Sequence, residues 1–197
     1  MLYTRKGDDG TTKTFGCDQR ISKSSAIAEA LGSLDEINSF LGICKVKSEL
    51  ARNASSIADA GGGKKLTLAD GTSFEKMIHE VQKNLFIIQA EIAGSKMSIS
   101  EDKIKEIEIV IDYIEHELPP IKSFFISGGT ELATFFDIAR TIARRAERRV
   151  IGVSDEGKIE ISDFTKSYLN RLSSFLYAMA RLTNHKFGIT EESPDYK

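Results

Sequence analysis

The sequence has little that would indicate a disulfide-linked, metal-bound or membrane-spanning fold. It contains two cysteines, three prolines and three histidines in 197 residues. Cys17 and Cys44 lack the C-x-x-C spacing of zinc sites, and the histidines are too scattered for a pattern such as H-E-x-x-H. No run reaches the roughly 18 apolar residues of a membrane span, and the first ten residues lack a signal-peptide core. We therefore expect no metal site, no membrane contact and a reducing, cytoplasmic location.

The sequence also lacks an excess of either charge. It has 27 basic and 29 acidic residues, a net charge of −2, and 41% hydrophobic residues. A balanced charge argues against a nucleic-acid partner, because such partners select basic surfaces. The length and the apolar fraction predict a single domain over residues 1–197. Any function that needs positive charge must therefore be local.

Proline is rare and the long segments repeat with helical period, which predicts an all-α five-helix bundle with a non-helical N-terminal arm. The arm covers 1–22, the bundle covers 24–187, and a flexible connection with three consecutive glycines covers 52–72. Residues 192–197 are expected to fray. The expected helices run from Ser24 or Ser25 to about Val46, from Thr72 or Ser73 to about Gly94, from Ser100 to Pro119, from about Glu131 to Ile151, and from near Ser162 to about Phe187.

The fourth expected helix is rich in arginine. Its ten residues 140–149 include Arg140, Arg144, Arg145, Arg148 and Arg149. On a helix Arg140, Arg144 and Arg148 fall within about 80° of one another, and Glu147 lies at the edge of the same face. A solvated face would alternate positive and negative charges at i and i+4, whereas this segment has one glutamate for five arginines. An anion site is slightly favoured over a structural ion-pair network, since guanidinium groups suit phosphate.

The N-terminal segment 3–14 combines two glycines, four threonines and three basic residues. Glycines let backbone N–H groups approach an anion, and hydroxyl and ammonium groups add donors. A β-hairpin that turns at Asp8-Asp9-Gly10 accounts for the same residues and is favoured from this segment alone. The two aspartates would brace that turn or meet a magnesium ion through water. The chain has no Walker A motif.

Helix five carries a polar face of Asn170, Ser174, Tyr177 and Arg181, within about 60° of one another. An asparagine on a bundle helix usually contacts solvent or a neighbouring helix. Nucleotide recognition by Asn170 would therefore need support from elsewhere in the chain.

Five motifs occur along nearly the whole chain: Y-T-R-x-G-D-x-G-T at 3–11, G-S-L-D-E at 32–36, S-G-G at 127–129, R-x-x-x-R-R-A-E-R-R at 140–149 and L-N-R-L-S at 169–173. In this order they resemble the PduO-type ATP:cob(I)alamin adenosyltransferases. No single motif is specific, but the combination is. The chain departs from the family at Ile126, where proline is frequent, and in its long connection 52–72.

The resemblance implies a five-helix bundle that assembles as a homotrimer with active sites between subunits. It implies transfer of the 5′-deoxyadenosyl group of ATP to the cobalt of cob(I)alamin, with Mg²⁺ held mainly by the ATP phosphates. A flavoprotein reductant and an adenosylcobalamin-dependent enzyme would be the partners. The alternatives are a non-catalytic carrier or sensor of ATP or corrinoid, a structural bundle and an RNA-binding bundle.

The resemblance also assigns residues. Arg144, Glu147 and Arg148 would be catalytic. Phe124 would lie at the lower face of the corrin and keep cobalt four-coordinate, although the adjacent Phe125 is an alternative and loop phenylalanines usually anchor in a core. Asp35 and Arg140 would form an ion pair across the subunit interface. The ATP-binding residues would be Thr4, Arg5, Lys6, Gly7, Thr12, Lys13, Lys23, Arg144, Arg145, Glu147, Arg148 and Asn170.

Overall fold

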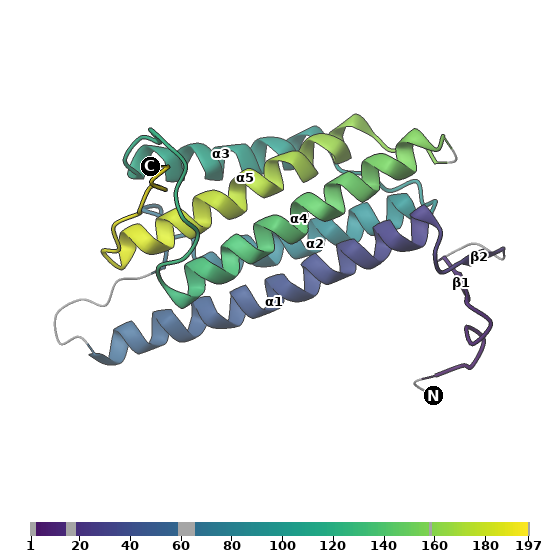
Figure 1. The fold of residues 1–197 in the computed structure, drawn as a ribbon, viewed down its shortest axis with the longest axis horizontal. Coiled ribbons are helices and arrows are strands. Elements are labelled where there is room, and N and C mark those ends of the chain that lie inside the picture. The colour runs from purple at the N-terminus through teal and green to yellow at the C-terminus, as the bar shows by residue number, and fades with distance from the viewer. Residues whose placement is uncertain (1–2, 15–18, 59–65, 158, 197) are drawn as a thin grey trace.

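The computed structural model describes residues 3–14, 19–58, 66–157 and 159–196. Within these residues five helices lie side by side, and a small antiparallel hairpin lies at one end of them (Figure 1). The predicted five-helix bundle with a non-helical N-terminal arm is confirmed. Its elements are β1 (Thr11–Lys13), β2 (Arg20–Ser22), α1 (Ala26–Ala58), α2 (Phe74–Ile92), α3 (Glu101–Glu117), α4 (Glu131–Asp155) and α5 (Asp163–Lys186).

The bundle is organised around α4 and α5, which pack against each other. Helix α1 packs on α4 and α2, while α3 packs on α5. Each helix turns one apolar stripe inward, and burial of these stripes is the main favourable term in folding. The largest fully buried side chains include Tyr168, Phe74, Phe136 and Phe175. None of the helices that the structure describes has the length and apolar character to cross a membrane.

Side-chain oxygen atoms cap the starts of α2 and α5, as the sequence indicated, whereas Ser100 precedes α3 without a side-chain capping bond. Ser73 Oγ accepts from the Lys76 N–H at 3.4 Å, and Ser162 Oγ accepts from the Thr165 N–H at 3.1 Å. Each bond satisfies one of the N–H groups that a first helical turn leaves unpaired. Caps at these positions fix where α2 and α5 begin.

The predicted connection over 52–72 is wrong at its start, because α1 continues to Ala58. The segment after Val46 is rich in Lys, Glu, Leu, Arg and Ala, which are good helix formers even where the apolar period fades. The three glycines lie outside the described residues. Beyond them, Leu66 and Leu68 are buried, so the end of this connection belongs to the core. Helix α4 likewise runs past Ile151, because the buried Val153 extends its stripe.

Two further expectations at the chain ends are corrected. The hairpin does not turn at Asp8-Asp9-Gly10, because its two paired strands, β1 and β2, both follow these residues. The start of the 192–197 segment is not frayed. The Ile126 N–H donates to the Glu192 carbonyl at 2.8 Å, so this part of the tail pairs a backbone group of a long loop.

Candidate functional site

The arginines of α4 divide into two sets. Arg145 Nη2 donates to both carboxylate oxygens of Glu36 at 2.6 Å, and Arg149 pairs with Glu29, so both are tied to α1. Among the described residues, Arg144 and Arg148 have no carboxylate partner, although Arg148 Nη1 donates to the Arg144 carbonyl at 3.1 Å. The expected shortage of negative charge is therefore limited to these two exposed side chains.

Helix α5 brings Asn170 next to the open arginines. Its Nδ2 donates to Glu147 Oε1 at 3.2 Å, and its Oδ1 accepts from Arg171 Nη1 at 2.8 Å. A concavity of about 270 Å³ is lined by Arg144, Glu147, Arg148, Ile151 and Asn170. The structure thus brings four of the predicted ATP-binding residues together around one opening.

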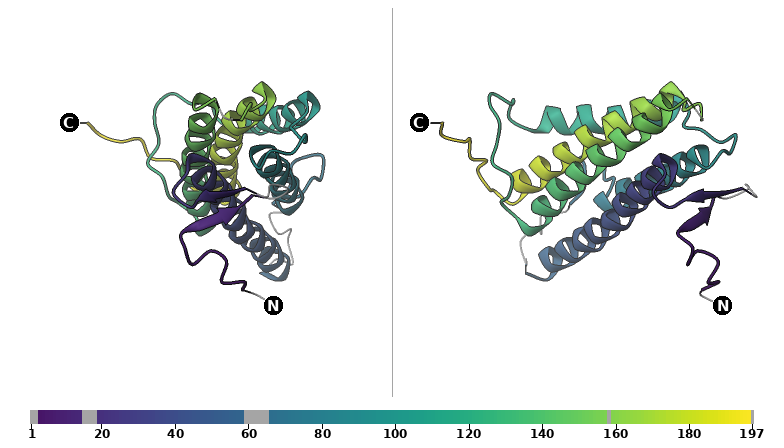
Figure 2. Two further views of the ribbon diagram at one scale, coloured as in Figure 1. Left: turned by 90° about the vertical axis from the view of Figure 1, so that its right-hand side faces the viewer. Right: turned by 45° about the vertical axis from the view of Figure 1, so that its right-hand side comes forward.

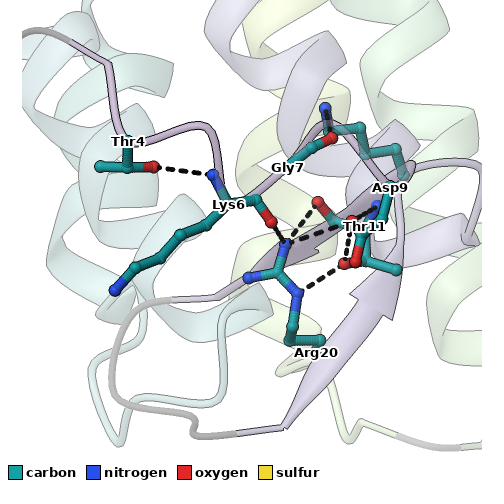
Figure 3. A network of polar contacts seen from close by, with 7 residues as sticks. Thr4, Lys6, Gly7, Asp9, Thr11 and Arg20 are labelled. Carbon is teal, nitrogen blue, oxygen red and sulfur yellow. Dashed lines mark hydrogen bonds and ion pairs between the residues drawn. The ribbon is translucent and has the colours of Figure 1, made fainter.

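The N-terminal arm is ordered by its own side chains (Figure 3). Lys23 Nζ donates to the Gly7 carbonyl at 2.7 Å. The Asp9 carboxylate accepts from the Thr11 hydroxyl at 2.7 Å and from the Thr11 N–H at 3.0 Å, and these bonds lower the pKa of Asp9. Asp9 therefore braces the turn that precedes β1.

Arg20 is a part of the arm that the sequence reasoning missed. It donates from Nη2 to the carbonyls of Lys6 and Thr11, the second at 2.9 Å, and from Nε to the Thr11 hydroxyl at 2.5 Å. The sequence contained little indication of this role, since Arg20 lies in a variable stretch. The residues next to a strand residue do not show which loop its side chain will contact.

Among the described residues, the arm makes no hydrogen bond or ion pair with the open arginines of its own chain. Figures 1 and 2 show the hairpin at the end of the bundle where α1 begins, with the segment before β1 projecting away from the helices. The predicted ATP-binding residues of this arm are exposed or half-buried. They are Thr4, Arg5, Lys6, Gly7, Thr12, Lys13 and Lys23. Within one chain, the two parts of the predicted ATP site are therefore separate.

A second, larger cavity of about 790 Å³ lies between α4, α5, the loop 121–129 and the tail 189–192. Phe124 lines it with 81% of its surface exposed. Phe125 is half-buried, and its ring lies 5.1 Å from the Arg181 guanidinium. Arg144 lines both this cavity and the smaller one, so the two openings share a side chain.

The loop that carries Phe124 is held by α5. Asn184 Nδ2 donates to the Gly128 carbonyl at 2.9 Å, and its Oδ1 accepts from the Thr130 N–H at 3.0 Å. Gly129 has φ +99°, and a Cβ there would lie 2.4 Å from Asn184 Oδ1. The S-G-G motif thus fits a close approach that only glycine allows. The sequence reasoning missed Asn184, because its partners lie 54 or more residues away.

A buried carboxyl group, that of Asp137, and a buried guanidinium group, that of Arg181, also line the larger cavity. Asp137 is 9% exposed, and burial raises its pKa, although the Arg140 guanidinium with Nε 3.5 Å from its Oδ1 opposes this shift. Arg181 is 5% exposed and pairs with Glu191 at 2.9 Å, and its Nη2 donates to the Pro119 carbonyl at 3.0 Å. The tail is therefore joined to the cavity wall through a buried ion pair.

Asp35 and Arg140 do not meet within the chain. Asp35 is exposed on α1. Arg140 Nε lies 3.5 Å from Asp137 Oδ1, and its guanidinium lies 5.8 Å from the centre of the Tyr177 ring. An ion pair between subunits stays a prediction, because it needs a second chain.

The part of the chain that the structure describes holds no group of three or more His, Cys, Asp or Glu side chains that could bind a metal. Cys44 is fully buried, and burial raises its pKa to about 12. Its thiol therefore lacks the exposed thiolate character of a nucleophile or a ligand.

The family described as Cobalamin adenosyltransferase matches residues 2–183. A corrinoid adenosyltransferase PduO of Citrobacter freundii is 35% identical over 191 residues, which cover 93% of this chain and 50% of that protein. A corrinoid adenosyltransferase of Bacillus subtilis is 33% identical over 195 residues, which cover 95% of this chain and 89% of that one. The chain spans about half the length of the PduO relatives it matches.

A similar solved structure is a variant of the PduO-type ATP:corrinoid adenosyltransferase from Lactobacillus reuteri in complex with cobalamin and ATP. Its TM-score is 0.82 at 26% identity, and the match covers 100% of this chain and 97% of that one. The likeness of the fold therefore extends over the whole helical bundle.

Proposed function

We propose, because the chain belongs to the cobalamin adenosyltransferase family, that it transfers the 5′-deoxyadenosyl group of ATP to the cobalt of cob(I)alamin. The products would be adenosylcobalamin and triphosphate. One observation carries the proposal: Arg144 lines both a small concavity with open guanidinium groups and a large cavity with an exposed phenylalanine. A polyphosphate site and a site for a large planar ligand would therefore adjoin.

Arg144, Arg148 and Glu147 would form the catalytic face. Cobalt attacks the 5′ carbon of ATP and the triphosphate leaves, so negative charge on the leaving group grows in the transition state. Guanidinium groups held in advance stabilise such charge without reorganisation. Glu147 and Asn170, joined at 3.2 Å, would orient the nucleotide. Mg²⁺ would be ligated by phosphate and water oxygens, since the described residues cluster no carboxylates for it.

The arm would close the ATP site from a neighbouring subunit of a homotrimer. This accounts for an arm that is internally ordered yet projects away from α4 of its own chain. Arg145 would contribute less than its neighbours, because its guanidinium already binds Glu36. The proposed ATP-binding set is Thr4, Arg5, Lys6, Gly7, Thr12, Lys13, Lys23, Arg144, Arg145, Glu147, Arg148 and Asn170.

Phe124 would meet the lower face of the corrin. An apolar ring at the axial position keeps cobalt four-coordinate, which makes reduction to cob(I)alamin easier. Both rings line the large cavity, but Phe124, which is 81% exposed, suits this role better than Phe125, whose ring is against Arg181. Asp35 and Arg140 would form an ion pair across the subunit interface. This pair would orient the part of the large cavity that the loop 121–129 lines.

The experiment that tests the proposal is an anaerobic spectrophotometric assay with ATP, Mg²⁺ and chemically reduced cob(I)alamin. ATP-dependent loss of the cob(I)alamin band, with formation of adenosylcobalamin, is the expected result. ATP binding without turnover would instead favour a carrier or sensor, and absence of both would make the arginines structural. In the cytoplasm, a flavoprotein would supply the electrons and an adenosylcobalamin-dependent enzyme would take the product.

A further inference from the structure

We infer that Arg20 is a positioning residue for ATP, which sets the shape of the arm without contacting the nucleotide itself. The inference rests on the proposed function, because it assumes that the arm binds phosphate. Arg20 lies on β2, and its guanidinium lies between Lys6 and Thr11 at the two ends of the loop that precedes β1 (Figure 3). One side chain thus closes the loop.

The loop needs such a closure because its own backbone bonds are few and long. The Asp8 N–H donates to the Arg5 carbonyl at 3.4 Å, and the Gly10 N–H donates to the Gly7 carbonyl at 3.2 Å. Arg5 has φ +59°, which is uncommon for a residue other than glycine. The three hydrogen bonds from Arg20 fix the two loop ends to β2.

Holding the Lys6 carbonyl has a direct consequence for the next peptide group. The C=O and N–H of a trans peptide point in opposite directions. Since the Lys6 carbonyl points at Arg20, the Gly7 N–H points away from Arg20. That N–H has no hydrogen-bond partner among the described residues, and outward backbone N–H groups of this kind bind anions.

The donors that Arg20 uses are directed into the arm. Its Nε and Nη2 reach the Thr11 hydroxyl and the two carbonyls, and its charge lies 3.6 Å from Asp9 Oδ1. The side chain is 30% exposed. A lysine would keep the positive charge but lacks the planar fork that reaches several acceptors at once. Arg20→Lys therefore separates positioning from charge.

The first test measures ATP affinity by calorimetry on the full chain without cobalamin, so that it does not depend on turnover. We expect Arg20→Ala and Arg20→Lys each to weaken ATP binding by about tenfold or more, the effect of losing a charge-assisted contact set. Lys105→Ala, which removes an exposed cation paired with Glu101, is the matched control and should bind as wild type. Wild-type affinity in Arg20→Ala, or full rescue by Arg20→Lys, would overturn the inference.

A second test distinguishes positioning from direct phosphate contact. Thr11→Val removes the hydroxyl shared by Arg20 and Asp9. Its effect on ATP affinity should add little to that of Arg20→Ala, because both changes loosen the same loop. Full additivity would contradict the inference. Millisecond hydrogen exchange on the ATP-free proteins should also show faster exchange of the Gly10 and Lys23 N–H groups in Arg20→Ala than in wild type. Unchanged exchange rates would argue against an ordering role for Arg20.

Steady-state kinetics separate this inference from the proposed function. In Arg20→Ala we expect the KM for ATP to rise about tenfold or more while the KM for cob(I)alamin stays within about twofold, since the loop lies in the arm. A wild-type protein with no turnover would remove the proposed function while the affinity test of Arg20 still stands. Wild-type turnover with an unchanged KM for ATP in the variant would remove only the inference.

Discussion

Arg144 and Arg145 are neighbours on one helix, yet their environments are opposite. Arg145 binds Glu36 through two oxygens, while Arg144 lines two cavities without a carboxylate partner among the described residues. Arg148 and Arg149 repeat the contrast one turn later, with Glu29 beside the second. The same residue type therefore serves either to join helices or to present charge, depending on which face of α4 meets α1.

The loop 121–129 has a similar pair. Both rings line the large cavity, but Phe124 is largely exposed, whereas the Phe125 ring is half-buried against Arg181. In each pair one member already has a partner within the chain, and the other has an open side chain, for which we propose a ligand. A side chain with a satisfied partner is worth less to a ligand, because binding would first have to break the existing contact.

The largest expected effect is on the open arginines. Arg144→Ala and Arg148→Ala should each lower kcat/KM by about 100-fold or more, because losing one preorganised donor costs roughly 10²–10³ in rate. Circular dichroism and Tm should stay near wild type, since both side chains are exposed. Arg149→Ala is the matched control on the paired face. Near-wild-type kcat/KM in both Arg144→Ala and Arg148→Ala would show that the unpaired arginines of α4 matter no more to activity than the paired ones.

The next effect concerns a paired arginine that is also buried. Arg181→Ala should destabilise the fold by about 3 kcal/mol, because it leaves the Glu191 carboxylate without its buried partner. Thermal unfolding at matched protein concentration measures this. Arg171→Ala, which breaks the more exposed pair with Glu108, should cost about 1 kcal/mol or less. Equal shifts in Tm would show that burial of Arg181 does not matter.

A third effect tests the phenylalanine pair. Phe124→Ala should reduce adenosylation that starts from cob(II)alamin about tenfold more than adenosylation from pre-reduced cob(I)alamin, a difference of roughly 1.4 kcal/mol in barrier. Parallel anaerobic assays with the two starting states measure the ratio. Phe86→Ala, at a 63% exposed ring on α2, is the control and should change neither rate. Equal losses along both routes would exclude a role in reduction.

The smallest effects are expected where α4 meets α1. Arg149→Ala and Arg145→Ala should each lower stability by about 1 kcal/mol or less, because exposed ion pairs contribute little. Arg145→Ala should also lower kcat/KM by less than about tenfold, since its charge already faces Glu36. The measurement that checks this is kcat/KM of Arg145→Ala against that of Arg144→Ala in the same assay. An equal loss in the two variants would place both guanidinium groups on the phosphate.

Local patterns predicted the helices well. The apolar period, the caps at Ser73 and Ser162 and the scarcity of proline indicated five helices, and all five are present. The errors fell at ends that local pattern does not determine. Helix α1 runs through a stretch with weak period. The start of the tail is ordered because a distant loop needs its carbonyl group.

The sequence by itself determined the helical bundle, the cluster of arginines and the motif order that marks the family. Only the tertiary structure decided which arginines are compensated, because Glu36 lies 109 residues from Arg145. It likewise decided that Arg20 closes the arm and that Asn184 holds the S-G-G loop. The physical reason is that helix period and caps depend on residues a turn apart, whereas partners across the bundle depend on which helices pack side by side.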